Sequence, residues 1–254
     1  MQRIGVDTGG TFTALVLLDE AGLHVHKGRS TPGDPSRAIL QGIRELLEMR
    51  GLAPGAAWPP GLDGVHGSTV ATNAVLERRW ARVALVATAG FGDVLRIGRQ
   101  TRRELYNFFV EDRRPLVDPG CTFTVPERVA ASGEVLEHLD ESDLLALVAQ
   151  LREARAESVA VCFLLSYVNA AHEQRAAAIL RDAGFAVSAS STVLPEYREF
   201  ERWSTTVVNA YVTPIMDRYL GLLVCSLNGT RLSIMQSNGG SISAARARTA
   251  AVQT

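Results

Sequence analysis

A carboxylate, two glycines and several hydroxyl side chains lie close together near the start of the chain. Asp7 ends an apolar run, Gly9 and Gly10 follow it, and a second apolar run begins after Thr13. Two strand-like runs joined by a Gly-Gly turn predict a β-hairpin, because glycine accepts a positive φ without a Cβ clash. The backbone N–H groups of such a turn can converge on one anion. The segment therefore predicts a phosphate-binding hairpin.

The side chains of this hairpin suit a nucleotide phosphate and its metal ion. The threonine hydroxyls add hydrogen-bond donors, and Asp7 stands where a carboxylate would hold Mg²⁺ directly or through water. A tight turn without any ligand is the alternative, because Gly-Gly turns are common in proteins. The residues that we expect to bind the cofactor here are Asp7, Thr8, Gly9, Gly10, Thr11 and Thr13.

The residues after the glycines separate this hairpin from other phosphate-binding loops. In a Walker loop or a Rossmann fingerprint the glycines open a helix, and the helix N-terminus takes the phosphate. Here the β-prone residues 14–18 lead to a second turn at 19–22, and residues 23–26 alternate as a half-buried strand does. His24 and His26 share one face of that strand. They have no third ligand nearby in the sequence, so we do not assign them to a metal.

A second polar cluster, His66-Gly67-Ser68-Thr69, follows a short apolar strand. Open α/β sheets bind their ligands at such strand ends. A neutral imidazole, two hydroxyls and a glycine would suit a carbonyl-bearing or phosphorylated substrate. From composition alone, a turn with a structural histidine is the favoured interpretation.

Two further segments carry groups that bind anions. Asn238-Gly239-Gly240 ends the last predicted strand, where Gly-Gly permits close backbone approach to a ligand, and an ordinary turn is the alternative. Four arginines follow Asp93, and guanidinium groups suit carboxylate or phosphate. A solvated charged face is the commoner outcome for such residues. Of the four, Arg96, Arg99, Arg102 and Arg103, we single out Arg99.

The elements that must position these residues follow from hydrophobic periodicity. A helix is predicted from Asp34 or Ser36 to about Gly51, and another over 140–154 with Asp140 as its cap. Strands over 82–88, 158–165 and 186–190 alternate with helices, which predicts a small α/β unit with parallel strands.

A long helix is predicted from Ser204 towards Leu227, with Pro214 kinking it or ending its first section. The charges that alternate from Tyr197 to Arg202 predict either a bridge between two lobes or a surface network before this helix.

Composition excludes several classes of protein. The chain has 254 residues, 46% of them hydrophobic and 21% charged, as in ordinary globular domains. A net charge of -1 gives no electrostatic reason to expect nucleic acid or an anionic membrane as a partner. No apolar run approaches the roughly 20 residues of a spanning helix, and no signal-like segment opens the chain. Cys121, Cys162 and Cys225 are isolated in sequence, so we expect reduced cysteines and a cytoplasmic protein.

Five segments together resemble the hydantoinase A/5-oxoprolinase family, within the actin/Hsp70/sugar-kinase ATPase superfamily. They follow one another in the family's order over nearly the whole chain. One departure is that the family usually has an aspartate where this chain has Ala14, which puts turnover in question. The five segments are residues 7–13, 66–74, 90–95, 204–212 and 235–240.

The resemblance implies an α/β fold, an RNase H-like lobe of an actin-type ATPase with a smaller α/β insertion. We expect the lobe to comprise residues 1–69 and 191–254, and the insertion residues 70–190. In the family the turn at 238–240 leads into a second glycine-rich phosphate segment and then the adenosine pocket. The chain stops at Thr254, before either. We therefore expect an N-terminal fragment with an incomplete lobe.

The resemblance also implies a function. We expect a subunit that uses ATP and Mg²⁺ to open a cyclic amide or imide by phosphorylating the carbonyl oxygen, as a hydantoinase or 5-oxoprolinase does. His66, Thr69 and Asn73 are expected to face the cleft and, with Arg99, to be catalytic. Asn238, Gly239 and Gly240 are expected to contribute to cofactor binding. The implied partner is a hydantoinase B-type subunit or domain, in an oligomer without nucleic acid or membrane.

Three alternatives remain open. A ketone carboxylase subunit of the same family would act through an enol phosphate. A sugar-kinase-like phosphotransferase shares the phosphate hairpin, but the segments at 66–69 and 204–212 count against it. The third alternative is a catalytically inactive fragment that only binds ATP or acts as a scaffold. The sequence does not name the substrate.

Overall fold

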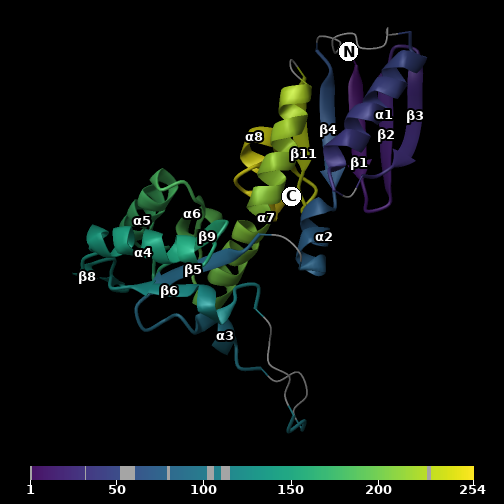
Figure 1. The fold of residues 1–254 in the computed structure, drawn as a ribbon. Coiled ribbons are helices and arrows are strands. Elements are labelled where there is room, and N and C mark those ends of the chain that lie inside the picture. Colours follow the sequence, from purple (N-terminus) through teal and green to yellow (C-terminus); the bar gives the residue numbers. More distant parts are fainter. Residues whose placement is uncertain are drawn as a thin grey trace. The chain divides into compact units, whose positions relative to one another are not determined.

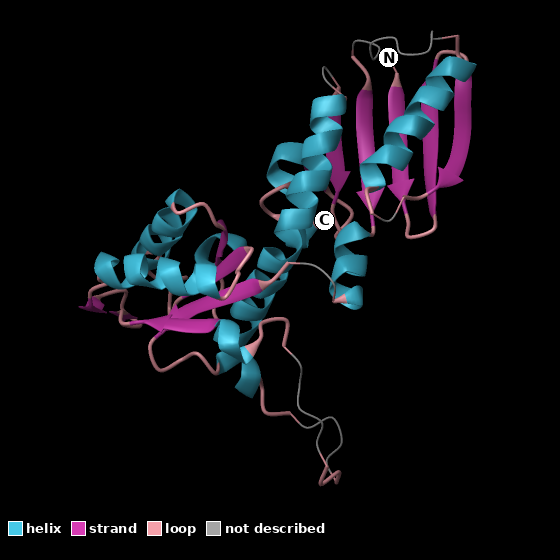
Figure 2. Ribbon diagram, viewed as in Figure 1, coloured by secondary structure: helices cyan, strands magenta, loops and turns pink. Residues whose placement is uncertain are grey.

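The chain folds into two compact units (Figures 1 and 2). The computed structural model describes residues 2–31, 33–51, 61–78, 81–101, 106–109, 115–227 and 230–254. The first unit comprises residues 1–79 and 215–254, and the second comprises residues 80–214. The lobe and insertion boundaries expected from the sequence stay a prediction.

The first unit is built on a six-stranded mixed sheet with the strand order β12-β11-β4-β1-β2-β3. β1, β2 and β3 form an antiparallel meander, β4 and β11 run parallel to β1, and β12 returns antiparallel to β11. This is the strand order of the predicted RNase H-like lobe. The strands are β1 (Arg3–Thr8), β2 (Phe12–Asp19), β3 (Gly22–Arg29), β4 (Asp63–Ser68), β11 (Arg231–Met235) and β12 (Ser241–Ser243).

Helix α1 (Pro35–Met49) covers one face of this sheet. Asp34 caps it as predicted, because its carboxylate accepts the N–H of Ser36 at 3.2 Å, and Pro35 suits the first helical position. The apolar stripe of the helix packs on Leu15 and Leu17, which are both fully buried. Each such side chain contributes about 1.5–3 kcal/mol when it leaves water. The buried residues of the stripe are Ile39, Ile43, Leu46 and Leu47.

Strand β3 faces the helix with its histidines instead of its apolar residues. His24 and His26 pair in register with Leu17 and Leu15, so they share the covered face. Their ring nitrogens reach Asp19 at 3.3 Å and Glu45 at 2.9 Å, respectively. The apolar side chains between them lie on the other face of the sheet, where Leu23 and Val25 are exposed.

The second unit contains a four-stranded sheet with the order β10-β9-β5-β6, all parallel. The predicted small α/β unit is thereby confirmed. Helix α4 begins at the predicted cap, where Asp140 accepts the N–H of Ser142 at 2.8 Å. The elements of this unit are β5 (Val83–Thr88), α3 (Val94–Ile97), η1 (Pro119–Cys121), β6 (Thr122–Val125), β7 (Arg128–Val129), β8 (Val135–Glu137), α4 (Glu141–Glu153), β9 (Ser158–Cys162), α5 (Ala171–Asp182), β10 (Ala186–Ala189) and α6 (Ser190–Val193).

The long helix α7 (Glu199–Ser226) differs from its prediction in two ways. It begins five residues before Ser204, and Pro214 lies inside it without ending it. A proline inside a helix costs about 3 kcal/mol. This helix, however, has buried side chains before and after Pro214, and they include Tyr211 and Met216. Tertiary burial therefore outweighs the missing hydrogen bond.

Short helices complete the first unit: α2 (Val70–Glu77), α8 (Ala244–Ala247) and η2 (Ala251–Gln253). Among the helices of the described residues, none combines the length and the apolar character needed to cross a membrane.

Candidate functional site

Three of the predicted segments meet at one edge of the six-stranded sheet. β1, β4 and β11 are parallel, and the pairings Thr8 with Ser68 and Ile234 with His66 align their carboxyl ends. A Cβ atom built on Gly67 would lie 3.6 Å from Met235 Sδ and 3.9 Å from Asp7 Oδ1. The glycine hairpin, the turn after β4 and the end of β11 therefore lie at the edge where open α/β sheets bind ligands.

The hairpin turn after β1 is held from behind by Ser30. The Ser30 hydroxyl donates to the carbonyl of Gly9 at 2.8 Å, and its N–H donates to the carbonyl of Thr11 at 2.9 Å. The Thr13 hydroxyl, which is fully buried, lies 3.0 Å from the Ser30 hydroxyl. Thr13 thus supports the turn from the interior and does not reach solvent.

The N–H groups at the tip of the turn are available to a ligand. The N–H of Gly9 donates to the carbonyl of Phe12 at 3.0 Å. Within the part of the chain that the structure describes, no protein group accepts from the N–H of Gly10 or Thr11. Both residues are exposed. Two adjacent free donors on a braced turn are the arrangement that an anion requires.

The reason predicted for the two glycines is wrong, because neither Gly9 nor Gly10 has a positive φ. Their neighbours explain them better. A Cβ on Gly9 would lie 3.4 Å from the carbonyl oxygen of Phe12, and a Cβ on Gly10 would lie 3.6 Å from Asn73 Nδ2. The glycines keep side-chain atoms out of the space around the turn.

Thr69, which directly precedes helix α2, and Asn73 within that helix border the same turn. Thr69 donates both its N–H and its hydroxyl to the carbonyl of Thr8, at 3.1 and 3.3 Å. Asn73 lies one turn further along, and its amide donates to the Thr69 hydroxyl at 3.3 Å. Thr69 is exposed and Asn73 half-buried. The structure therefore brings these two predicted residues against the glycine turn.

Asp7 points to the opposite face of the sheet from α1 and is exposed. Ala14 pairs directly with it across the hairpin, and Lys27 follows in the same row on β3. The Lys27 ammonium lies 4.7 Å above the ring of Phe12. Among the described residues, no three His, Cys, Asp or Glu side chains gather as a metal-binding group. Asp7 is thus a single carboxylate at the edge.

His66 lies in the interior of the first unit and is 1% exposed. Its Nδ1 lies 3.3 Å from the carbonyl of Val6, and its Nε2 is hydrogen-bonded to the hydroxyl of Tyr219 on α7. Burial lowers the pKa of His66 to about 4, although the Val6 carbonyl and the charge of Asp7 act in the opposite direction. The imidazole is therefore neutral at neutral pH. Its predicted catalytic role stays a prediction.

Tyr219 was missed by the sequence reasoning. Its ring meets that of His66 edge to face, with centroids 5.6 Å apart, and it is 3% exposed. The only sequence signal was a tyrosine among the apolar positions of a long helix, which is also the pattern of ordinary core residues.

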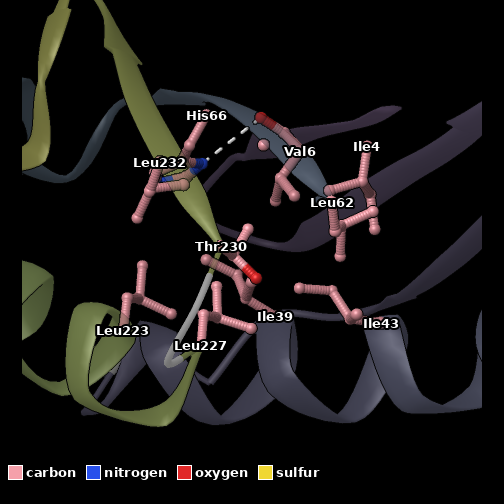
Figure 3. A pocket seen from close by; sticks show the side chains of 11 residues that line it. Ile4, Val6, Ile39, Ile43, Leu62, His66, Leu223, Leu227, Thr230 and Leu232 are labelled. Atoms are coloured by element: carbon pink, nitrogen blue, oxygen red, sulfur yellow. Dashed lines mark hydrogen bonds between the residues drawn. The ribbon is translucent and has the colours of Figure 1, made fainter. Parts of the chain in front are cut away.

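The space beside His66 is a packing gap and not a ligand pocket (Figure 3). It measures about 10 Å³ and lies between the sheet and helices α1 and α7. A volume of that size corresponds to one water molecule at most. The side chains around it are mainly apolar: Ile4, Val6, Ile39, Ile43, Leu62, Leu223, Leu227 and Leu232, with His66 and Thr230.

The remaining predicted residues have partners of their own. Arg99, in the second unit, forms an ion pair with Glu201 and keeps about half of its side chain exposed. Asn238 accepts the N–H of Gly240 at 2.9 Å, and Gly239 has a φ of +87°, as a tight turn requires. This turn joins β11 to β12 and is exposed. Arg102 and Arg103 lie outside the described residues.

Sequence comparison places the whole arrangement in a family. The model of the hydantoinase/oxoprolinase N-terminal region matches residues 3–184, and the hydantoinase/oxoprolinase model matches residues 202–254. The chain belongs to the hydantoinase/oxoprolinase family. The family that the sequence segments resembled is thus confirmed.

Individual relatives agree with this membership. The caprolactamase subunit alpha of Pseudomonas jessenii is 35% identical over 86% of this chain and 32% of its own length. The 5-oxoprolinase of Saccharomyces cerevisiae is 33% identical over 94% of this chain and 22% of its own length. The chain therefore spans about a third or less of the length of these relatives.

Solved structures agree as well. A nucleotide-free structure of acetone carboxylase superposes with a TM-score of 0.83 at 27% identity, covering 99% of this chain and 38% of that one. A structure of ATP-dependent caprolactamase from Pseudomonas jessenii gives 0.79 at 33% identity, covering 94% and 36%. The predicted fold class, an α/β lobe of the actin-type ATPases with a smaller α/β insertion, is confirmed by these neighbours and the sheet topology.

Proposed function

We propose that this chain supplies the phosphate-binding lobe of an ATP-dependent enzyme that opens a cyclic amide or imide. The observation that carries the proposal is the braced glycine turn near the carboxylate of Asp7, where the N–H groups of Gly10 and Thr11 have no acceptor within the described part of the chain. Likeness to a caprolactamase and a 5-oxoprolinase supports the choice of reaction. In such a reaction the carbonyl oxygen takes the γ-phosphoryl group of ATP and ADP leaves. Water then adds to the activated carbonyl carbon, the C–N bond of the ring breaks, and inorganic phosphate is released.

The residues divide into three roles in this proposal. The N–H groups of Gly10 and Thr11, with the Thr11 hydroxyl, receive phosphate oxygens, while Gly9 keeps the approach free of side chains. Thr8 and Thr13 hold the turn from the buried side. Asp7 holds hydrated Mg²⁺, which suits a single carboxylate because this ion keeps several waters and shares phosphate oxygens. The ion neutralises phosphate charge, and the lobe's own contribution is positioning.

Thr69 and Asn73 are proposed to contact the transferred phosphoryl group. They border the glycine turn, and both are accessible from solvent at least in part. Arg99 is kept as a candidate for the substrate's polar groups, and Asn238, Gly239 and Gly240 as a second approach to the nucleotide. His66 is buried and neutral, and we propose that it supports the site through its contact with the backbone of β1.

A partner subunit of the hydantoinase B type completes the proposed enzyme, in a cytoplasmic oligomer. One relative is named a subunit alpha, which supports a multi-subunit assembly. A ketone carboxylase subunit is the second candidate, and likeness to acetone carboxylase favours it. Comparing ATP consumption with lactams, and with ketones plus bicarbonate, would separate the two candidates. An inactive ATP-binding fragment would consume ATP with neither.

The phosphate site can be tested on this chain alone. Calorimetric titration with magnesium tripolyphosphate probes the turn without requiring an adenosine pocket, and Mg·ATP is titrated beside it. Gly10→Ala is expected to weaken binding at least tenfold, because the methyl group enters the cradle while the fold has room for it, 3.6 Å from Asn73. Gly33→Ala is the matched control, since Gly33 is exposed and a Cβ there meets nothing within 4 Å. Equal binding by Gly10→Ala, or no binding by the wild-type chain, would contradict the proposal.

A further inference from the structure

We infer that Tyr219 is a positioning residue for the phosphate turn, and that it acts through His66. From helix α7, its hydroxyl holds the His66 ring against the last residues of β1, directly before the turn that the proposed function assigns to phosphate. The inference rests on that proposed function. It adds to that function a residue outside the turn, Tyr219, and the hydrogen bonds that connect this residue to β1.

The donor and the acceptor can be assigned for both hydrogen bonds of His66. The carbonyl of Val6 can only accept, so His66 Nδ1 carries the proton and donates to it at 3.3 Å (Figure 3). His66 Nε2 is then an acceptor, and the Tyr219 hydroxyl is its donor. The chain of contacts runs from α7 through a residue of β4 into the backbone of β1. It ends one residue before Asp7.

The same hydroxyl lies at the meeting point of the two strand ends. Burial raises the pKa of Tyr219, while the hydroxyls of Thr8 and Ser68 beside it act in the opposite direction. Thr8 Oγ1 makes no hydrogen bond of standard geometry to any residue that the structure describes. Thr8 also supplies the carbonyl that receives Thr69. Tyr219 therefore lies next to the ends of both strands, β1 and β4, that carry the candidate site.

Burial makes the pair sensitive to the loss of either partner. His66 and Tyr219 are 1% and 3% exposed, and each is neutral at neutral pH. Neither group can exchange a proton with a substrate from that position. A buried acceptor that loses its donor carries the cost of its desolvation, and a shift of the side chain and the backbone next to it lowers that cost. This makes a structural coupling between α7 and the turn.

The decisive comparison uses a single and a double variant. Tyr219→Phe removes the donor and leaves Nε2 of His66 unpaired. The double variant Tyr219→Phe with His66→Leu replaces both members of the buried Tyr219–His66 pair, although it also removes the donor to the Val6 carbonyl, so we expect it to restore part of the lost stability. Tyr211→Phe is the control, since Tyr211 is also a buried tyrosine of α7 but belongs to the second unit.

Binding of magnesium tripolyphosphate is measured by calorimetry at a temperature where all variants are folded. We expect Tyr219→Phe to weaken binding at least tenfold, the double variant to remain equally weak despite its recovered thermal stability, and Tyr211→Phe to bind as the wild type does. Recovery of binding in the double variant would mean that Tyr219 only stabilises the fold, and would overturn the inference. So would unchanged binding in Tyr219→Phe.

Amide chemical shifts separate failure of the inference from failure of the proposed function. If the wild-type chain does not bind the probe, the proposed function fails. In that case the N–H signals of Gly9 and Gly10 still test the link. Their displacement in Tyr219→Phe and not in Tyr211→Phe would support it, and their constancy would overturn it.

Discussion

The carboxyl ends of the parallel strands differ between the two sheets of the molecule. In the first unit the carboxyl ends of the parallel strands lead into an open turn with the exposed carboxylate of Asp7, where the N–H groups of Gly10 and Thr11 have no acceptor among the residues that the structure describes. In the second unit the corresponding strand ends are closed by buried charged side chains. Thr88, at the end of β5, donates to Glu127 and receives the N–H of Leu164 at 2.9 Å.

The closure of the second sheet continues at β9. Glu173 is fully buried and accepts the N–H of Phe163 at 2.9 Å and that of Ser191 at 2.6 Å. Arg202, also fully buried, donates to the carbonyl of Phe163 at 3.1 Å and pairs with Glu199. The surface network predicted for residues 197–202 is therefore wrong for Arg202.

The comparison shows why topology alone does not locate a site. Both units place loops at the carboxyl ends of parallel strands, where α/β sheets bind ligands. In one unit the polar groups are already paired with one another, and their hydrogen-bonding capacity is used by the fold. In the other unit, Ser30 holds the turn from the buried side, and the polar groups of the turn face solvent. Four experiments test whether the two edges differ in this way.

The largest expected effect is on the closed edge. Arg202→Met should cost about 3–5 kcal/mol of unfolding free energy, because it leaves the carboxylate of Glu199 without its buried partner. Hydrogen exchange followed by mass spectrometry reports the loss in the second unit. Arg96→Met is the control, since Arg96 is 79% exposed and its pairing with Asp93 is long, at 3.9 Å. A loss of tripolyphosphate binding in Arg202→Met at full stability would break the contrast.

The second effect is a pH dependence of the first unit. The pKa of His66 is about 4 in the folded chain and 6.5 in its ordinary state, so the unfolded chain binds the proton more tightly. The contribution of neutral His66 to the free energy of unfolding is therefore fully present above pH 6.5. It is lost as the pH drops towards 4, and the loss is about 3 kcal/mol in total. Urea unfolding between pH 4 and 7 measures it. The variant with Tyr219→Phe and His66→Leu should lose this part of the pH dependence, and an unchanged profile would contradict the assignment to His66.

The third effect concerns the open edge itself. Asp7→Asn should weaken Mg·ATP binding about tenfold, or about 1.4 kcal/mol, while the unfolding free energy changes little because Asp7 is exposed. Asp93→Asn, at a carboxylate that is 73% exposed in the second unit, should leave binding unchanged. Equal binding by both variants would remove Asp7 from the site.

The smallest effect tests the departure at Ala14. Ala14→Asp places a second carboxylate directly across the hairpin from Asp7, with Cβ atoms about 5 Å apart. Without metal the repulsion should cost roughly 0.2–1 kcal/mol of stability. Mg²⁺ should recover it and tighten Mg·ATP binding. Thermal unfolding with and without Mg²⁺ measures both terms, and a variant indifferent to Mg²⁺ would show that the two carboxylates do not share an ion.

The features that depend on neighbouring residues could be predicted from the sequence. The hairpin at Gly9 and Gly10, the caps at Asp34 and Asp140, and the parallel strands of the second unit were predicted and are present. Cap chemistry and strand periodicity act over a few residues, so their signals are complete in the local sequence. Three of the five family segments, residues 7–13, 66–74 and 235–240, lie at the edge of the first sheet, and the other two belong to the second unit.

The direction in which several side chains face follows from tertiary packing and could not be predicted from the sequence. The ring of His66 turns inward because α7 presents Tyr219 to it, and the histidines of β3 take the covered face because α1 packs there. Arg202 of α7 is buried where it donates to Ser190 of α6 and to the carbonyl of Phe163, which follows β9. Each outcome depends on an element distant in sequence, and burial, with the hydrogen bonds that must accompany it, is assigned only when those elements meet.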